Sequence, residues 1–222
     1  AYIGRSTNTY TREAAKRAVR LIHDNLLEAY ENGQNIEARA NMLEAAYRAG
    51  IAFTRSYVGY VHGIAHSLGG RYGIPHGLAN AVILPHMLRA YGPAAERKLA
   101  ELARDAGIAP ATANDQTGAQ AFIEWVDDMN ARLGIPRHLD GISAADVPAM
   151  AAHAAAESNP LYPVPKLMDA EELARMYRVA AGGHFADEPA VHAGEGQRRS
   201  TERPSRIART AERKVAAWSS KK

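Results

Sequence analysis

The feature of this sequence that most restricts its fold is the helical spacing of its apolar residues. From Ala14 to Ala29 they recur three and four positions apart, which is typical of an amphipathic helix, and Thr11 is the expected N-cap. No segment alternates apolar and polar residues as a half-buried strand does. The sequence therefore predicts an all-α bundle of about eight helices. The further helical segments, bounded mostly by glycine or proline, are 36–49, 52–68, 77–91, 93–107, 118–134, 142–158 and 169–183.

Composition narrows the chemistry that this bundle can carry. The 222 residues include no cysteine, which excludes disulfides, thiolate metal sites and thiol nucleophiles. Any metal would be held by histidine, carboxylate or carbonyl groups. The chain does not open with a secretory signal pattern, and its best apolar run, 78–85, is too short to cross a bilayer. We expect a cytoplasmic protein.

The last part of the chain differs in composition from the rest. Residues 187–222 contain nine Lys/Arg and five Asp/Glu, whereas the preceding residues contain 18 and 19. We therefore divide the chain into an all-helical domain at 1–183 and a basic, disordered tail at 184–222. The tail leaves an alternative function open, a helical interaction protein that binds nucleic acid or an anionic surface. A solvated extension without a partner is the favoured interpretation.

Three of the nine histidines fall within one short stretch, HGIAHSLGGRYGIPHG. His62 and His66 are four positions apart, so a helix places them on one face with a rise of about 6 Å between them. The glycines that follow allow a sharp reversal that would bring His76 back toward His62, and we expect no β-branched residue to fit at Gly69 or Gly70. Spacing alone leaves two interpretations open, a metal site or ordinary hydrogen-bonded histidines, and it does not say which rings would bind.

The longer stretch HGIAHSLGGRYGIPHGLANAVILPH closely resembles the signature of the iron-containing (metal-dependent) alcohol dehydrogenase family. The likeness extends to the helix before this stretch, to ERKLAELARDAGI after it and to the segment ESNPLYPVPKLMDAEEL. It covers about residues 1–180, which in that family form the helical C-terminal domain. The resemblance therefore implies a metal-binding helical domain.

The resemblance also implies roles for individual residues. His62 and His76 match the two metal ligands that the family takes from this domain. His66 matches the histidine that faces the nicotinamide and the substrate, which makes it the expected catalytic and cofactor-binding residue. Phe53 and Tyr57 fall where family members line the substrate pocket.

The activity implied is hydride transfer between an alcohol or aldehyde and NAD or NADP, with a divalent metal as Lewis acid. Fe(II) is the expected metal, with zinc or manganese as alternatives at the same nitrogen and oxygen donors. A zinc polyol dehydrogenase of the same superfamily is the less favoured enzyme. We expect the chain to bind a small alcohol or aldehyde and to bind neither nucleic acid nor a membrane. The resemblance also allows a homodimer.

Part of the family's pattern is missing from these 222 residues. Family members take two more ligands, an Asp and a His four residues later, from a helix that ends in Glu-Ala-Tyr, and Ala1-Tyr2 resemble the end of that motif. No G-x-G-x-x-G or P-loop pattern occurs in the sequence. We therefore expect the N-terminal nucleotide-binding domain to be absent and the chain alone to be inactive as a dehydrogenase.

Overall fold

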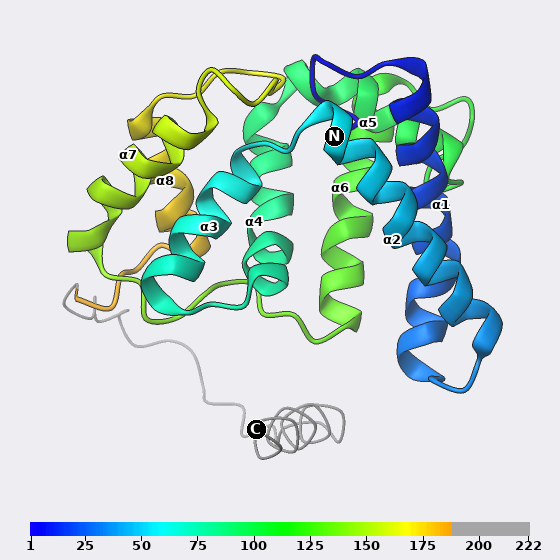
Figure 1. The fold of residues 1–222 in the computed structure, drawn as a ribbon, viewed down its shortest axis with the longest axis horizontal. Helices are drawn as coiled ribbons and strands as arrows, with labels where there is room; N and C mark the ends of the chain where they lie inside the picture. Colours follow the sequence, from blue (N-terminus) through cyan, green and yellow to red (C-terminus); the bar gives the residue numbers. More distant parts are fainter. Residues whose placement is uncertain (188–222) are drawn as a thin grey trace, which may run out of the picture. The chain divides into compact units, whose positions relative to one another are not determined.

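A computed structural model describes residues 1–187 of the chain. This part contains eight α-helices and one short 3-10 helix, η1, and no strand, so the all-α class and the expected number of helices are confirmed (Figure 1). The elements are α1 (Thr9–Glu31), α2 (Ile36–Ser56), α3 (Tyr60–Tyr72), α4 (His76–Tyr91), α5 (Pro93–Asp105), α6 (Asp115–Arg132), η1 (Ala144–Asp146), α7 (Val147–Ser158) and α8 (Ala170–Ala180).

The helices pack mainly as neighbours in sequence, with α4 at the centre. The long helices α1 and α2 form an antiparallel hairpin, α5 packs against α6, and α7 packs against α8 (Figure 1). Helix α3 lies between α4 and α7, and α4 also contacts α5, α6 and α8. The site described below is formed where α3 turns back into α4.

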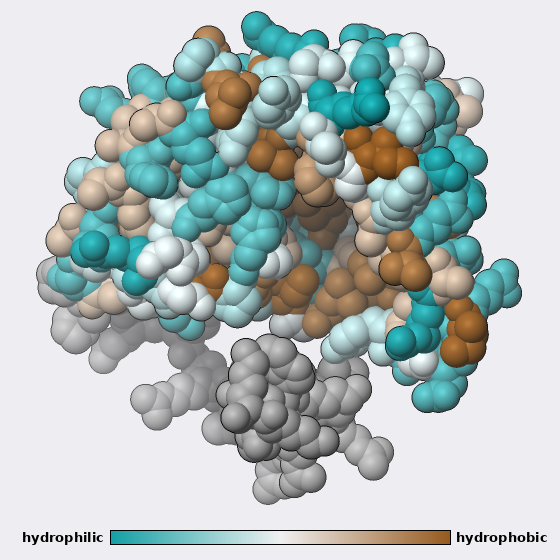
Figure 2. Space-filling view, viewed as in Figure 1, coloured by the Kyte–Doolittle hydropathy of each residue, from teal (hydrophilic) through white to brown (hydrophobic). Residues whose placement is uncertain are grey.

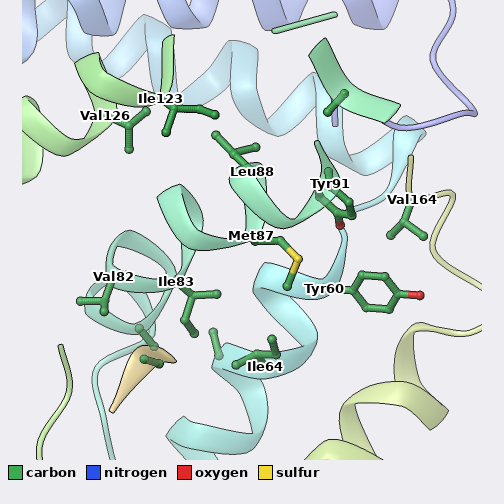
Figure 3. Packing of buried hydrophobic residues seen from close by; sticks show 14 of the residues in the cluster. Tyr60, Ile64, Val82, Ile83, Met87, Leu88, Tyr91, Ile123, Val126 and Val164 are labelled. Carbon is green, nitrogen blue, oxygen red and sulfur yellow. The ribbon is translucent and has the colours of Figure 1, made fainter. Parts of the chain in front are cut away.

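The core is densest around α3 and α4. Figure 3 shows Tyr60 and Ile64 of α3 beside Met87 of α4, all three fully buried. On the other side of α4, Leu88 points toward Ile123 of α6. Removing one such side chain from water stabilises the fold by about 1.5–3 kcal/mol, so these contacts hold the two helices in a fixed relation.

The beginnings of two helices differ from the sequence prediction. The N-cap of α1 is Asn8, not Thr11: the Asn8 side chain accepts a 3.0 Å hydrogen bond from the Thr11 backbone N–H, and Thr11 Oγ1 accepts one from the Asn8 N–H. Thr11 is thus the second member of a capping box. Similarly, the predicted helix 52–68 is divided, because the chain leaves helical geometry after Ser56 and α3 begins only at Tyr60.

Helix α2 is longer than predicted because Gly50 does not end it. The helix continues to Ser56, and a side chain at position 50 would meet nothing within 4 Å. A glycine inside a helix costs about 1 kcal/mol relative to alanine, which the packing of α2 along α1 outweighs. The helix ends instead at Tyr57, whose φ of 60° lies in the region that favours glycine.

The compact unit runs from Ala1 to Glu188, past the domain boundary expected at 183. Phe185 is buried in the core, and the Asp187 carboxylate accepts a 2.7 Å hydrogen bond from Ser143 Oγ before η1. The predicted basic and disordered character of the tail beyond this unit falls outside the described residues. Within residues 1–187, no helix combines the length and the apolar character needed to cross a membrane.

Candidate metal site and the adjoining cavity

The three histidines of the motif lie together at the turn between α3 and α4. His62 and His66 are on α3, and His76 is the first residue of α4. The ring centroids of His62 and His76 are 5.3 Å apart, those of His66 and His76 are 5.2 Å apart, and those of His62 and His66 are 6.0 Å apart. The reversal that the sequence predicted is therefore present, and it brings His76 back beside α3.

The glycines make this reversal differently from the prediction. Gly69 and Gly70 lie inside α3, where a Cβ at Gly70 would meet nothing within 4 Å and one at Gly69 would make an ordinary 3.4 Å contact with the carbonyl oxygen of Ile74. A Cβ therefore has room at both positions, and the expectation that no β-branched residue fits there stays a prediction. The residue that needs to be glycine is Gly73, which caps α3 in the left-handed conformation at φ 67°.

His62 is the more enclosed of the two predicted ligands. Burial, and to a lesser extent the neighbouring His76 and His66, together lower the pKa of its imidazole to about 4. The ring is therefore neutral at physiological pH, which is the form that binds a metal ion. This environment is favourable for a ligand and unfavourable for a charged histidine.

His76 has a partner that the sequence analysis did not identify. Asn80, one turn further along α4, places its side-chain nitrogen 2.8 Å from Nε2 of His76. The amide oxygen of Asn80 is buried and has no hydrogen-bond partner among the described residues. The four-residue spacing between His76 and Asn80 was a signal that could have suggested this contact.

His66 also has an unpredicted partner, Glu157 in the last turn of α7. The distance from Nδ1 of His66 to Oε1 of Glu157 is 2.7 Å, and the Tyr162 hydroxyl donates a 2.8 Å hydrogen bond to the same oxygen. Nothing in the sequence pairs His66 with Glu157, because 91 positions separate them. The contact follows from the packing of α3 against α7.

The described residues supply only part of a metal coordination sphere. Imidazole nitrogens suit iron and zinc, and His62 and His76 are close enough to bind one ion. Within residues 1–187, however, no cluster of three or more histidine or carboxylate side chains is arranged to hold a metal. The donors of His62 and His76 fit a metal ion, and the described residues alone do not complete a coordination sphere around them.

A cavity of about 530 Å³ adjoins His62. Its walls come mainly from apolar residues of α1, α2 and α4, and Figure 2 shows hydrophobic residues at the bottom of a hollow in this face of the molecule. Phe53 lines the cavity, as do Ala1 and Asn80. Tyr57 lies at the end of α2, does not line the cavity and is 46% exposed. Of the two predicted substrate-binding residues, the structure thus brings Phe53 to the site.

Comparison with known proteins gives one consistent result. A family model described as "Fe-containing alcohol dehydrogenase family, C-terminal" matches residues 1–181. The 1,3-propanediol dehydrogenase of Citrobacter freundii is 40% identical over 182 residues, which cover 81% of this chain and 47% of that protein. Alcohol dehydrogenase 4 of Saccharomyces cerevisiae is 37% identical over 158 residues, covering 69% of this chain and 40% of that protein.

Solved structures agree with the sequence comparison. The crystal structure of a 1,3-propanediol oxidoreductase superposes with a TM-score of 0.76 at 37% identity, covering 81% of this chain and 47% of that one. An alcohol dehydrogenase from Oenococcus oeni superposes with a TM-score of 0.75 at 32% identity, with the same coverage of both chains. The chain spans about half the length of the curated relatives it matches.

Proposed function

Since this chain belongs to the iron-containing alcohol dehydrogenase family and corresponds to its C-terminal domain, we propose that it carries half of a metal-dependent dehydrogenase active site. The reaction is hydride transfer between a small alcohol or aldehyde and NAD or NADP. A cytoplasmic location fits a chain without cysteine. The alternative of a helical interaction protein that binds nucleic acid through its tail gains no support from the relatives.

His62 and His76 are the proposed metal ligands. The observation that carries this assignment is the 5.3 Å separation of their ring centroids, together with the lowered pKa that keeps His62 neutral. Fe(II) is the proposed ion, and zinc or manganese would suit the same donors. A metal held by these two residues would supply a Lewis acid for the oxygen of the alcohol or aldehyde.

The remaining residues of the site act on the substrate and the nicotinamide. His66, whose ring lies 5.2 Å from that of His76, is proposed to exchange the proton of the substrate oxygen and to contact the nicotinamide. Phe53 contributes an apolar wall to the cavity beside His62. Tyr57 is proposed as a second substrate contact, at the end of the same helix.

Metal titration of the 222-residue chain tests the ligand assignment. In calorimetric titrations with Zn²⁺, and with Fe²⁺ under anaerobic conditions, His62→Ala and His76→Ala should each weaken binding by about tenfold or more, because each removes one of two imidazole donors. His66→Ala should bind as tightly as the unchanged chain. His153→Ala, on the exposed side of α7, is the matched control for removal of a histidine. If His66→Ala abolishes binding and His76→Ala does not, the pair on α3 is the chelate and the assignment is wrong.

A further inference from the structure

Glu157 stands out among the polar residues near the site because the proposed function gives it no task. Its side chain is 23% exposed, at the end of α7, and one of its oxygens lies 2.7 Å from Nδ1 of His66. The 2.8 Å hydrogen bond from the Tyr162 hydroxyl reaches this same oxygen. His153 lies 3.9 Å from the other oxygen, too far for a hydrogen bond. The Tyr162 hydroxyl and Nδ1 of His66 therefore both contact one carboxylate oxygen, which fixes its position.

The packing of α3 against α7 brings this carboxylate to His66. Gly63, on α3, faces the last turns of α7, and a Cβ at this position would lie 2.5 Å from Oγ of Ser158. The absence of a side chain there lets the two helices approach closely. His66 lies three residues after Gly63, and Glu157 directly precedes Ser158, so the same close approach brings Nδ1 of His66 to 2.7 Å from Oε1 of Glu157. The contact between His66 and Glu157 thus arises from the packing of two helices and does not depend on the conformation of a loop.

A carboxylate in this position determines which nitrogen of the ring carries the proton. An ionised carboxylate can only accept hydrogen bonds, so the nitrogen of His66 that faces Glu157 must be the donor. In the neutral ring this places the hydrogen on Nδ1 and leaves Nε2 without one. No hydrogen bond from Nε2 of His66 to another side chain is present within residues 1–187.

We propose that Glu157 is a positioning residue for His66, which holds the proton of the neutral ring on Nδ1 and leaves Nε2 free to exchange a proton with the substrate. The use of Nε2 in the reaction rests on the proposed function, whereas the position of the ring proton does not. A purely structural role, in which Glu157 only ties α7 to α3, would leave the tautomer of His66 unchanged when Glu157 is replaced.

The tautomer can be read from the ring nitrogens by two-bond ¹H–¹⁵N correlation spectra of the chain labelled at histidine. The unchanged chain should show His66 mainly protonated at Nδ1. Glu157→Ala should return the ring toward the Nε2-protonated form that free imidazole favours, with the ratio of tautomers changing by about tenfold, the effect of one hydrogen bond to a charged group. Tyr162→Phe removes the other hydrogen bond to Glu157 and should keep the Nδ1-protonated form.

Two outcomes would overturn the proposal: a His66 ring protonated mainly at Nε2 in the unchanged chain, or a tautomer ratio that stays the same in Glu157→Ala. If Glu157→Ala does not fold, Glu157→Gln preserves the size of the side chain and should still reduce the preference for Nδ1, because the amide can donate as well as accept. The spectra need neither metal nor nicotinamide. A failed metal titration would therefore remove the proposed ligands without changing this result.

Discussion

The side-chain amide of Asn130 donates a 2.8 Å hydrogen bond to the carbonyl oxygen of Ala81, joining α6 to the middle of α4. That carbonyl is the one that residue 85 would satisfy in an uninterrupted helix, but residue 85 is a proline and has no N–H to donate. Asn130 thus replaces the missing backbone partner. With this replacement hydrogen bond, α4 continues from His76 to Tyr91. The helix therefore supplies a residue of the candidate site and also lies at the centre of the core.

This relationship predicts that the cost of removing Asn130 depends on Pro85. Asn130→Ala leaves the Ala81 carbonyl without a protein partner and should lower the free energy of unfolding by about 1–3 kcal/mol. In a Pro85→Ala background the restored N–H satisfies the carbonyl, so the same substitution should cost less. Urea unfolding of the four chains measures the coupling. Equal costs in the two backgrounds would mean that Asn130 does not compensate for the proline.

Two glycines of α3 should respond in opposite ways to alanine. Gly63→Ala places a Cβ 2.5 Å from Oγ of Ser158 and should destabilise the chain by about 1–3 kcal/mol through overpacking against α7. Gly70→Ala meets nothing within 4 Å and should stabilise the chain by up to about 1 kcal/mol through helix propensity. Thermal unfolding of the two variants compares them directly.

A second substitution tests the cause assigned to the Gly63 effect. Ser158→Ala removes the oxygen that the new methyl group would meet, and this hydroxyl is buried without a partner among the described residues. The combination Gly63→Ala with Ser158→Ala should therefore recover part of the lost stability. No recovery would show that the conflict lies with the α7 backbone.

Asp187 should make the free energy of unfolding of the compact helical unit depend on pH in the acidic range. Hydrogen bonds from the Ser143 hydroxyl and the backbone N–H groups of Ala144 and Ala145 lower the pKa of its carboxyl to about 2. Because the unfolded value is about 3.9, the stabilisation is complete above that pH and is lost as the pH falls toward 2. The difference in unfolding free energy between the unchanged chain and Asp187→Asn should thus narrow below about pH 4. Ser143→Ala, which removes one of the donors, should reduce this dependence on pH without abolishing it. A constant difference from pH 7 to pH 2 would contradict the prediction.

The fold was largely predictable because most of its helices are specified by local spacing. Even for α4, which contains an internal proline, the sequence predicted a helix that extends to Tyr91, since its apolar pattern continues past Pro85. The break after Ser56 was not expected, because a tyrosine in the left-handed region carries no compositional signal. Gly50 wrongly suggested the end of a helix, because helix packing outweighs the weak preference of glycine against helical structure.

The candidate site was predictable only in the part that lies within one stretch of sequence. His62, His66 and His76 are separated by a few turns of helix and one reversal, so their meeting could be inferred from spacing. The partner of His66 could not, because Glu157 is brought there by the packing of two helices that lie far apart in the sequence. Contacts of this kind depend on the tertiary structure.

These 222 residues alone should not catalyse the oxidation of an alcohol. The described part has two proposed imidazole ligands and no cluster of three residues arranged to hold a metal, and the sequence has no glycine-rich dinucleotide-binding pattern. Purified chain supplied with Fe²⁺ or Zn²⁺, a primary alcohol and NAD⁺ or NADP⁺ should therefore show no steady formation of NADH or NADPH by absorbance.

Two measurements make this absence of turnover informative. Metal analysis of the assayed sample excludes simple loss of the ion, and calorimetric titration with NAD⁺ should show no binding, because the pyrophosphate has no glycine-rich helix N-terminus to hold it. Sustained turnover by homogeneous chain would show that the active site is complete without the half that the longer relatives possess. Binding of NAD⁺ without turnover would locate a nucleotide site in this domain and leave the missing metal ligands as the cause of inactivity.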